Sequence, residues 1–333
     1  MSSIINTGIV LTDKEGYVKY SDSYTNSIFN LEKNSLIFEK IKDNEISNFI
    51  KQEINNNTSS IKEFNIEKDN NLFILSIRVV KIYDNNFIIN IIDLSKTRKL
   101  ENLQREFVAN VSHELRTPLT SIKMAAESLQ IGAISDEKMK YKFLSNIQRE
   151  ADRLTRLVNE LLVLANLDNK VTLHISKFNL NELLNDVVTT MKYHADLNDI
   201  TLIGDFPDDL PYIEADRDRL HQVLINLVDN AIKCNKQNGK VTLYARIKDN
   251  DNILIKVIDT GIGIHKVDIG RIFDRFFRVD KSRSRVTGGT GLGLSIVKDL
   301  IVAHNGTIDV ESEIDVGTTF TITLPILNSK KSE

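Results

Sequence analysis

Hydrophobic residues in the first part of the chain fall in short runs bounded by turn-forming residues, which predicts β-strands. Four such runs lie at Gly8–Asp13, Tyr17–Tyr20, Leu72–Val80 and Phe87–Ile92. Between the second and the third, Asp22–Ile54 has a polar, helical pattern. A hairpin, helices and a closing antiparallel pair therefore predict a small α/β domain over residues 1–93.

From Leu94 the apolar period changes to three and four residues, the spacing of one helical face. The first apolar stripe consists of Leu100, Leu103, Phe107, Val111 and Leu115. After a loop at Ile131–Asp136, a second helix over Glu137–Leu167 carries Phe143, Ile147, Ala151, Leu154, Val158, Leu161 and Ala165. Two helices alone cannot bury two stripes, so residues 94–168 are predicted to form a helical hairpin that dimerises into a four-helix bundle.

Residues 171–327 alternate between helical and strand patterns and predict a third domain, followed by a polar tail at 328–333. Asn179 and Asp216 stand where N-caps of helices are expected. Strands are predicted at Ile200–Ile203, Val241–Ile247, Ile253–Ile258, Gly306–Val310 and Thr318–Leu324, and a helix at Leu292–Ala303. This irregular order favours two layers, with helices on one face of a mixed sheet. The whole chain is predicted to be a multidomain α+β protein.

Composition narrows the classes of function. The 333 residues carry a formal net charge of −3, which gives no electrostatic footprint for nucleic acid. One cysteine, Cys234, excludes an internal disulfide framework and fits a reducing cytosol. No run of eighteen apolar residues occurs, so no membrane span is expected.

The first candidate for chemistry is the helix around His113. Glu114 is its neighbour, Thr117 lies one turn later, and Pro118 follows inside the helical pattern. Proline in a helix interior costs about 3 kcal/mol, because it removes a hydrogen bond and its ring presses on the carbonyl four residues back. A reactive position and a kinked helix with a solvent-facing histidine are equally good interpretations of this stretch alone.

Two glycine-containing stretches predict a nucleotide site. Asp259 ends a predicted strand and can accept the exocyclic amine of adenine, while Gly261 and Gly263 allow the backbone to approach a flat base. Gly289, Gly291 and Gly293 open a helix, whose free N–H groups suit phosphate. Neither a Walker loop nor a dinucleotide fingerprint is present.

A helix and a basic segment complete this site. Asn226, Asn230 and Lys233 fall on one face of a predicted helix, where amide oxygens together with phosphate suit Mg²⁺ and the ammonium neutralises phosphate. The segment Arg271–Arg278 joins aromatic residues, among them Phe277, to guanidinium groups, and Lys281, Arg283 and Arg285 follow it. We expect a lid here, with Arg278 reaching the transferring phosphate.

Together the motifs resemble those of two-component sensor histidine kinases, in order and in spacing. The matching stretches are His113-Glu-Leu-Arg-Thr-Pro118, Asn226-Leu-Val-Asp-Asn-Ala231, Asp259-Thr-Gly-Ile-Gly263, Phe273-Asp-Arg-Phe-Phe277 and Gly289-Thr-Gly-Leu-Gly293. The resemblance covers about Leu94 to Leu327 and points to the phosphate- and cell-wall-sensing Gram-positive subgroup; residues 1–93 resemble a PAS domain.

This resemblance implies a homodimer whose ATP-binding domains use Mg-ATP to phosphorylate His113. A response regulator then receives the phosphoryl group on an aspartate. In this scheme Glu114 is the general base, and Thr117 orients a water for dephosphorylating the regulator. Whether His113 is served by its own subunit or by the partner depends on the loop Ile131–Asp136, so both arrangements stay open.

Two departures and two alternatives accompany the resemblance. Family members commonly carry Tyr-Thr-Pro where this chain has Cys234-Asn-Lys, so an aromatic residue of the adenine pocket is missing. The family usually has membrane spans ahead of the PAS domain, which leaves open a soluble member or the cytosolic portion of a membrane sensor. The alternatives are a hydrolytic ATPase of the same superfamily and a non-catalytic, nucleotide-binding signalling scaffold. For residues 1–93, a packing and dimerisation module is favoured over a ligand-binding one.

Overall fold

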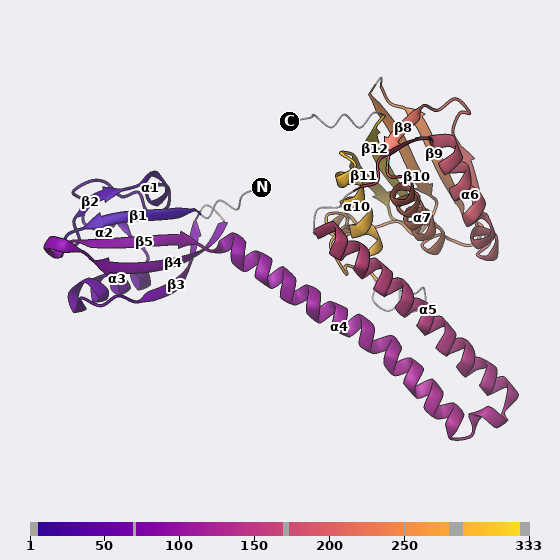
Figure 1. The fold of residues 1–333 in the computed structure, drawn as a ribbon, viewed down its shortest axis with the longest axis horizontal. Coiled ribbons are helices and arrows are strands. Elements are labelled where there is room, and N and C mark those ends of the chain that lie inside the picture. Colours follow the sequence, from indigo (N-terminus) through magenta and orange to yellow (C-terminus); the bar gives the residue numbers. More distant parts are fainter. Residues whose placement is uncertain (1–5, 69–70, 169–172, 250, 280–288, 327–333) are drawn as a thin grey trace. The chain divides into compact units, whose positions relative to one another are not determined.

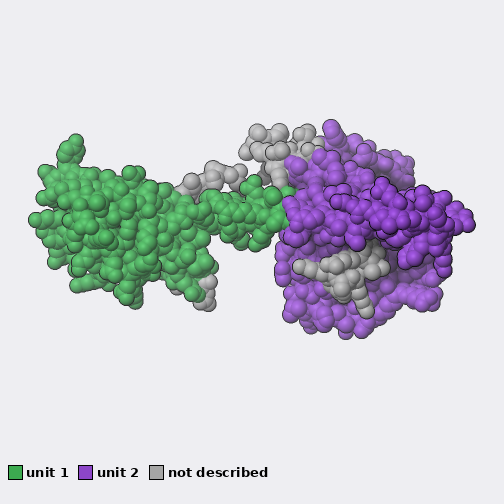
Figure 2. Space-filling view, turned by 90° about the horizontal axis from the view of Figure 1, so that it is seen from below, with its two compact units in different colours: residues 1–109 green, residues 110–333 purple. Residues whose placement is uncertain are grey.

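The computed structural model describes residues 6–68, 71–168, 173–249, 251–279 and 289–326 (Figure 1). The chain forms two compact units, residues 1–109 and residues 110–333 (Figure 2). Mixed helices and sheets in separate units confirm the predicted multidomain α+β class. No helix in the described part of the chain combines the length and apolar character needed to cross a membrane.

Unit 1 is built on a five-stranded antiparallel sheet of order β2-β1-β5-β4-β3. The strands are β1 (Thr7–Thr12), β2 (Val18–Ser21), β3 (Ile61–Lys68), β4 (Asn71–Lys81) and β5 (Phe87–Asp93). The helices are α1 (Ser23–Phe29), α2 (Ile37–Lys40) and α3 (Asn44–Asn56), with a 3₁₀ turn at Tyr83–Asn85. Inward residues such as Val10, Leu75 and Ile89 are fully buried in one core with residues of these helices.

Strand β3 is absent from the sequence prediction. Its sequence, IKEFNIEK, is mostly polar, and only Phe64 among its eight residues is buried. Because β3 is the edge strand beside β4, it needs backbone pairing more than apolar side chains. The other four strands lie where their alternation predicts them.

Helix α4 runs without interruption from Ser95 to Gln130 and includes Pro118, which is buried. A turn with a 3₁₀ segment at Ala133–Ser135 joins α4 to α5 (Glu137–Asp168). Both helices match their predicted ranges. On α5 the most buried apolar residues are Leu157 and Leu164, which are not members of the predicted stripe; Val158 of that stripe is exposed.

The rest of unit 2 is a two-layer structure. Its main sheet has the order β11-β12-β10-β9-β7, in which only β7 and β9 pair in parallel, so the predicted mixed sheet is confirmed. The strands are β7 (Thr201–Asp205), β9 (Lys240–Ile247), β10 (Asn252–Asp259), β11 (Thr307–Glu313) and β12 (Gly317–Pro325). The helices are α6 (Leu180–Leu197), α7 (Arg217–Lys233), α8 (Lys266–Ile269) and α10 (Gly293–Ala303).

Local signals place the helices of this layer correctly. Asn179 caps α6 by accepting from the Asn181 amide, and Asp216 caps α7 by accepting from the Arg219 amide, as predicted. The small sheet of β6 (Ser176–Asn179) and β8 (Tyr212–Ala215) was not predicted. Each of its strands has four residues, too few for a clear alternation.

His304 joins the ends of two helices inside unit 2. Its Nδ1 lies 2.7 Å from the Leu300 carbonyl oxygen, and its Nε2 accepts from the Asp216 amide at 3.1 Å. The two contacts require the neutral tautomer with the proton on Nδ1. Burial lowers the pKa of His304 below its usual value of 6.5, against the opposing effects of the Leu300 contact and the Asp216 charge.

We expect this histidine to make unit 2 less stable in acid. Since the folded-state pKa lies below the unfolded one, the unfolded chain binds a proton that the folded chain excludes. The contribution of His304 to the free energy of unfolding is therefore fully present above pH 6.5 and is lost as the pH falls through the folded-state pKa. Denaturant unfolding at several values between pH 7.5 and pH 5.5 measures this loss. His304→Gln should make the free energy of unfolding depend less on pH. An equal dependence on pH in both proteins would contradict the assignment.

Candidate active site

His113 lies on α4 with its side chain exposed. One turn later, the Thr117 hydroxyl donates to the His113 backbone carbonyl at 3.2 Å. This contact adds a bond next to the position where Pro118 has no N–H to give to the helix. The exposed imidazole is accessible to a second reactant, and the Thr117 hydroxyl is engaged with the backbone.

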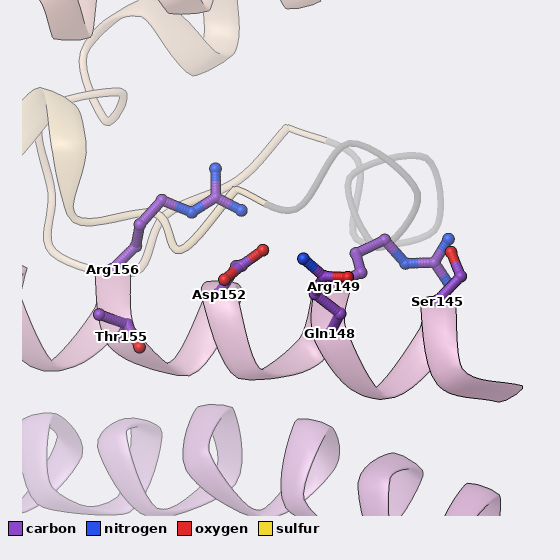
Figure 3. A pocket seen from close by; sticks show the side chains of 6 residues that line it. All are labelled: Ser145, Gln148, Arg149, Asp152, Thr155 and Arg156. Carbon is purple, nitrogen blue, oxygen red and sulfur yellow. The ribbon is translucent and has the colours of Figure 1, made fainter.

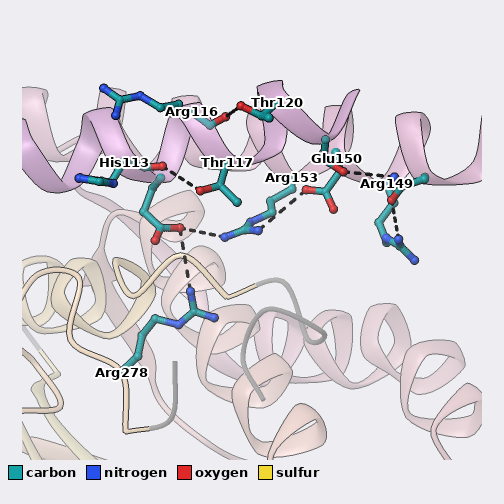
Figure 4. Close-up of polar contacts among 11 residues, drawn as sticks. His113, Arg116, Thr117, Thr120, Arg149, Glu150, Arg153 and Arg278 are labelled. Atoms are coloured by element: carbon teal, nitrogen blue, oxygen red, sulfur yellow. Dashed lines mark hydrogen bonds and ion pairs between the residues drawn. The ribbon is translucent and has the colours of Figure 1, made fainter. Parts of the chain in front are cut away.

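The Glu114 carboxylate is held by two arginines (Figure 4). Arg153 of α5 donates to Glu114 Oε2 at 2.8 Å, and Nη1 of Arg278 lies 4.0 Å from the same oxygen. The Arg153 side chain is only 9% exposed and also pairs with Glu150 at 3.9 Å. In the described structure Glu114 therefore bonds to arginine rather than to the His113 ring. Arg278 brings a positive charge from the predicted lid segment to the residue beside the reactive histidine.

Asp259 occupies the predicted position at the end of β10. Strand parity puts it on the buried face, in line with Ile253, Ile255 and Val257. Its Oδ1 accepts from the amides of Gly261 and Thr318 at 2.8 and 3.1 Å. Among the described residues none bonds to Oδ2, which leaves that oxygen for an outside donor such as an amine. Burial raises the pKa of this carboxyl, although the two amide bonds oppose the rise.

Glycine is required at three of the predicted positions. A Cβ on Gly261 would lie 2.3 Å from the Cys234 carbonyl oxygen. Gly263 and Gly291 have φ of +70° and +76°, the left-handed region, and a Cβ there would meet backbone atoms of Glu313 or Phe276. A Cβ on Gly289 meets no described atom within 4 Å, and one on Gly293 reaches only Asn226 Nδ2 at 4.0 Å.

This contrast gives a matched pair of substitutions. Gly263→Ala should lower the free energy of unfolding by about 1–3 kcal/mol, because it adds a strained φ and a clash with backbone. The added Cβ would stand 2.1 Å from the Glu313 carbonyl oxygen. Gly289→Ala is the control, and its urea midpoint should lie close to that of the wild type. Urea denaturation followed by circular dichroism measures both, and equal midpoints would contradict the steric argument.

The polar face predicted on α7 is present. Asn226, Asn230 and Lys233 are all half-buried on this helix. The Asn226 side-chain nitrogen is buried and has no hydrogen-bond partner among the described residues. Lys233 donates to Asp229, which also lies 3.3 Å from His194 Nε2. An amide nitrogen is a hydrogen-bond donor, so its open position fits an acceptor such as a phosphate oxygen. Through their side-chain oxygens, Asn226 and Asn230 remain our predicted holders of Mg²⁺.

The aromatic and basic segment is described in part. The Arg271 guanidinium stacks over the Phe277 ring at 4.5 Å, and Phe273 packs edge-on against Phe320 of β12. The contact of Phe273 with Phe320 anchors the start of the predicted lid to the sheet. Lys281, Arg283 and Arg285 lie outside the described residues.

Sequence reasoning assigned no role to three polar residues of the site, Arg153, Glu160 and Thr290. Arg153 of α5 bonds to Glu114 of α4, within the helical hairpin. Thr290, inside the glycine stretch, donates to the Glu160 carboxylate of α5. The only available signal was charge at helix positions in register with buried Leu157 and Leu164, and helical spacing alone does not say which charges are buried.

Comparison with known families agrees with this geometry. Residues 103–170 match the His Kinase A (phospho-acceptor) domain, and residues 215–328 match the histidine kinase-, DNA gyrase B- and HSP90-like ATPase family. Sensor histidine kinase WalK of Bacillus subtilis is 38% identical over 280 residues, which cover 80% of this chain and 45% of that protein. The chain spans about half the length of the curated relatives it matches.

Two solved structures are also similar. ShkA in complex with AMPPNP has 31% identity and a TM-score of 0.50, over 66% of this chain and 45% of that one. Histidine kinase ThkA in complex with response regulator protein TrrA matches at a TM-score of 0.58 over 98% of this chain and 97% of that one. At 23% identity, the second match shows the fold alone. The motifs, their placement and the two family matches show that this chain belongs to the two-component sensor histidine kinases.

Proposed function

We propose that this chain transfers the γ-phosphoryl group of Mg-ATP to His113. The observation that carries the proposal is the contact between the two halves of the site: Arg278, from the segment between the predicted adenine and phosphate motifs, lies 4.0 Å from Glu114, the neighbour of His113. An accessible histidine beside a carboxylate is suited to nucleophilic transfer. The ATPase-family match over residues 215–328 supports a nucleotide as the donor.

The proposed step is a displacement at phosphorus. One ring nitrogen of neutral His113 bonds to the γ-phosphorus while the bond from phosphorus to the β,γ-bridging oxygen breaks and ADP leaves. The ring proton passes to the Glu114 carboxylate. Since Glu114 now bonds to Arg153, this role requires the carboxylate to turn from Arg153 to the ring.

The remaining residues bind and neutralise the nucleotide. Asp259 Oδ2 accepts the adenine amine, and the amides at the start of α10 together with Lys233 receive phosphate. Asn226 and Asn230 would hold Mg²⁺, which neutralises charge on the phosphates when bound. Arg278 is suited to the transferring group, because a guanidinium binds phosphate in a bidentate manner.

Transfer is favoured over hydrolysis by the chemistry of α7. In related ATPases such as gyrase and MutL, the helix position that matches Asn226 is a glutamate that activates water. The amide of Asn226 cannot accept a proton, so it cannot act as this base. Incubation with γ-labelled ATP separates the alternatives. Transfer predicts label retained on the chain, stable in base and lost in acid; free phosphate without retained label would favour an ATPase, and binding without either product a scaffold.

The partner proposals follow from the same family. We expect a homodimer through residues 94–168, since Leu100, Leu103 and Val158 of the two predicted stripes stay exposed in the single chain. An aspartate of a response regulator would accept the phosphoryl group from His113. Unit 1 is proposed as a PAS-like sensor, which its sheet order of β2-β1-β5-β4-β3 supports.

A regulator phosphatase activity is proposed through Thr117. Its exposed side chain lies one turn from His113, and rotation about one bond would release its hydroxyl from the His113 carbonyl to orient a water. Thr117→Ala should then slow dephosphorylation of the regulator by about tenfold or more while autophosphorylation persists. Loss of both activities together would instead indicate a structural role for this hydroxyl.

A further inference from the structure

The glycine turn before α10 is bound to a carboxylate of α5. The Thr290 hydroxyl donates to Oε2 of Glu160 and also accepts from the Leu292 amide at 3.3 Å. Thr290 is only 7% exposed, and α10, the helix that follows it, packs against α5. The contact therefore joins the helical hairpin to the turn that the proposed function assigns to phosphate.

The same turn is suited to hold an anion. Helix α10 begins at Gly293, its N-cap residue Leu292 makes no side-chain cap bond, and no acidic residue lies in its first turn. The first N–H groups of such a helix attract negative charge. Nearby, the buried nitrogen of Asn226 has no partner among the described residues. The position of a Cβ on Gly293 is 4.0 Å from that nitrogen.

The charge of Lys233, which the proposed function assigns to phosphate, also acts on Glu160. Arg156 and Lys233 attract its carboxylate, whereas Asp229 repels it. Burial has the largest effect and raises the pKa of Glu160. A carboxylate in partly desolvated surroundings interacts more strongly with such groups than one in water. Glu160 thus presents an internal negative charge to the turn and to Lys233.

We propose that Glu160 is a negative determinant of nucleotide affinity, which competes with the nucleotide phosphates for the glycine turn and for the charge of Lys233. The inference rests on the proposed function, because it takes that turn as the phosphate site. Chains with the Glu160–Thr290 contact bind nucleotide weakly, and chains without it bind tightly. The apparent association constant for nucleotide is then the intrinsic constant multiplied by the fraction of chains that lack the contact.

Coupling of this kind is reciprocal. If the contact weakens nucleotide binding, saturating nucleotide must weaken the contact by the same factor. Release of the glycine turn from α5 would also free the nucleotide motifs to approach His113. Glu160 would thus link occupancy of the nucleotide site to the position of the hairpin.

The test compares Glu160→Gln and Glu160→Ala with Asp152→Asn by calorimetric titration of ADP with Mg²⁺. Asp152 lies two turns earlier on α5, in an open hollow it lines with Ser145, Gln148, Arg149, Thr155 and Arg156 (Figure 3). Both Glu160 variants should bind ADP about fivefold more tightly or better, since a hydrogen bond to a charged group and its repulsion of phosphate are removed. Asp152→Asn removes the same charge without the contact and should match wild type.

A double-mutant cycle with Thr290→Val separates the contact from a general change in charge. In the Thr290→Val background Glu160→Gln should have a clearly smaller effect, because one partner of the hydrogen bond is already gone. Three results would overturn the inference: an equal gain in ADP affinity from Glu160→Gln in both backgrounds, an equal gain in affinity in Asp152→Asn, or no gain in affinity in either Glu160 variant. Thermal melting of each variant confirms that it is folded.

Label transfer from γ-labelled ATP distinguishes failure of this inference from failure of the proposed function. Unchanged ADP affinity with normal labelling of His113 would overturn the role of Glu160 alone. Tighter ADP binding in the Glu160 variants without any labelling would support that role and contradict the kinase proposal. Absence of ADP binding in every variant would contradict both.

Discussion

His113→Gln is expected to abolish retention of the γ-phosphoryl group on the chain, by about a thousandfold or more, because glutamine offers no nucleophilic ring nitrogen. The side chain of His113 is exposed on α4, so the substitution should leave the fold intact. Labelling with γ-labelled ATP, followed by neutral gel electrophoresis, measures the effect. ADP affinity should stay at the wild-type value, because His113 makes no described contact with the nucleotide motifs.

His174→Gln is the control for this experiment. The chain has six histidines, and His174 is likewise exposed, but it lies outside the α4–α5 hairpin. The His174→Gln variant should retain as much label as the wild-type chain. If the His113 variant retained as much label as the wild-type chain, another side chain would be accepting phosphate. This result would contradict the proposed function.

The second large effect is expected at Asp259. Asp259→Asn can keep the oxygen that accepts from Gly261 and Thr318, so the turn should keep its conformation. The Oδ2 that would accept the adenine amine becomes an amide nitrogen, which repels that amine. Loss of a hydrogen bond to a charged group predicts ATP binding about tenfold to a hundredfold weaker.

Stability and binding should change in opposite directions in this variant. Burial raises the pKa of Asp259, which means that its charged form is disfavoured where it stands. Removal of the charge should therefore leave the free energy of unfolding equal or increased while nucleotide affinity falls. Asp251→Asn, an exposed carboxylate just before the start of β10, is the matched control. Wild-type ATP affinity of Asp259→Asn would contradict the adenine assignment.

Local signals were enough to predict much of the fold. The caps at Asn179 and Asp216 are set by residues two or three positions away, so the sequence shows them directly. The two long helices were predicted because their apolar period persists over many turns. Strand β3 and the small β6–β8 sheet were missed because backbone pairing with a distant segment defines them.

The candidate site divides in the same way. Glycines at positions 261, 263 and 291 were predicted from their motifs, and each is required by backbone that a Cβ would strike. The partners of Glu114 and Thr290 could not be predicted. Arg153 lies 39 residues from Glu114, and Glu160 lies 130 residues from Thr290, so only the fold brings them together.

The central claim is that His113 accepts the phosphoryl group, and locating that group on the chain tests it most directly. The full chain is incubated with Mg-ATP, digested at neutral pH and sequenced by electron-transfer mass spectrometry, which preserves phosphohistidine. The account predicts the added phosphoryl mass on His113, within the α4 peptide. Phosphate on any other residue, or an unmodified chain after ATP has bound, would contradict it.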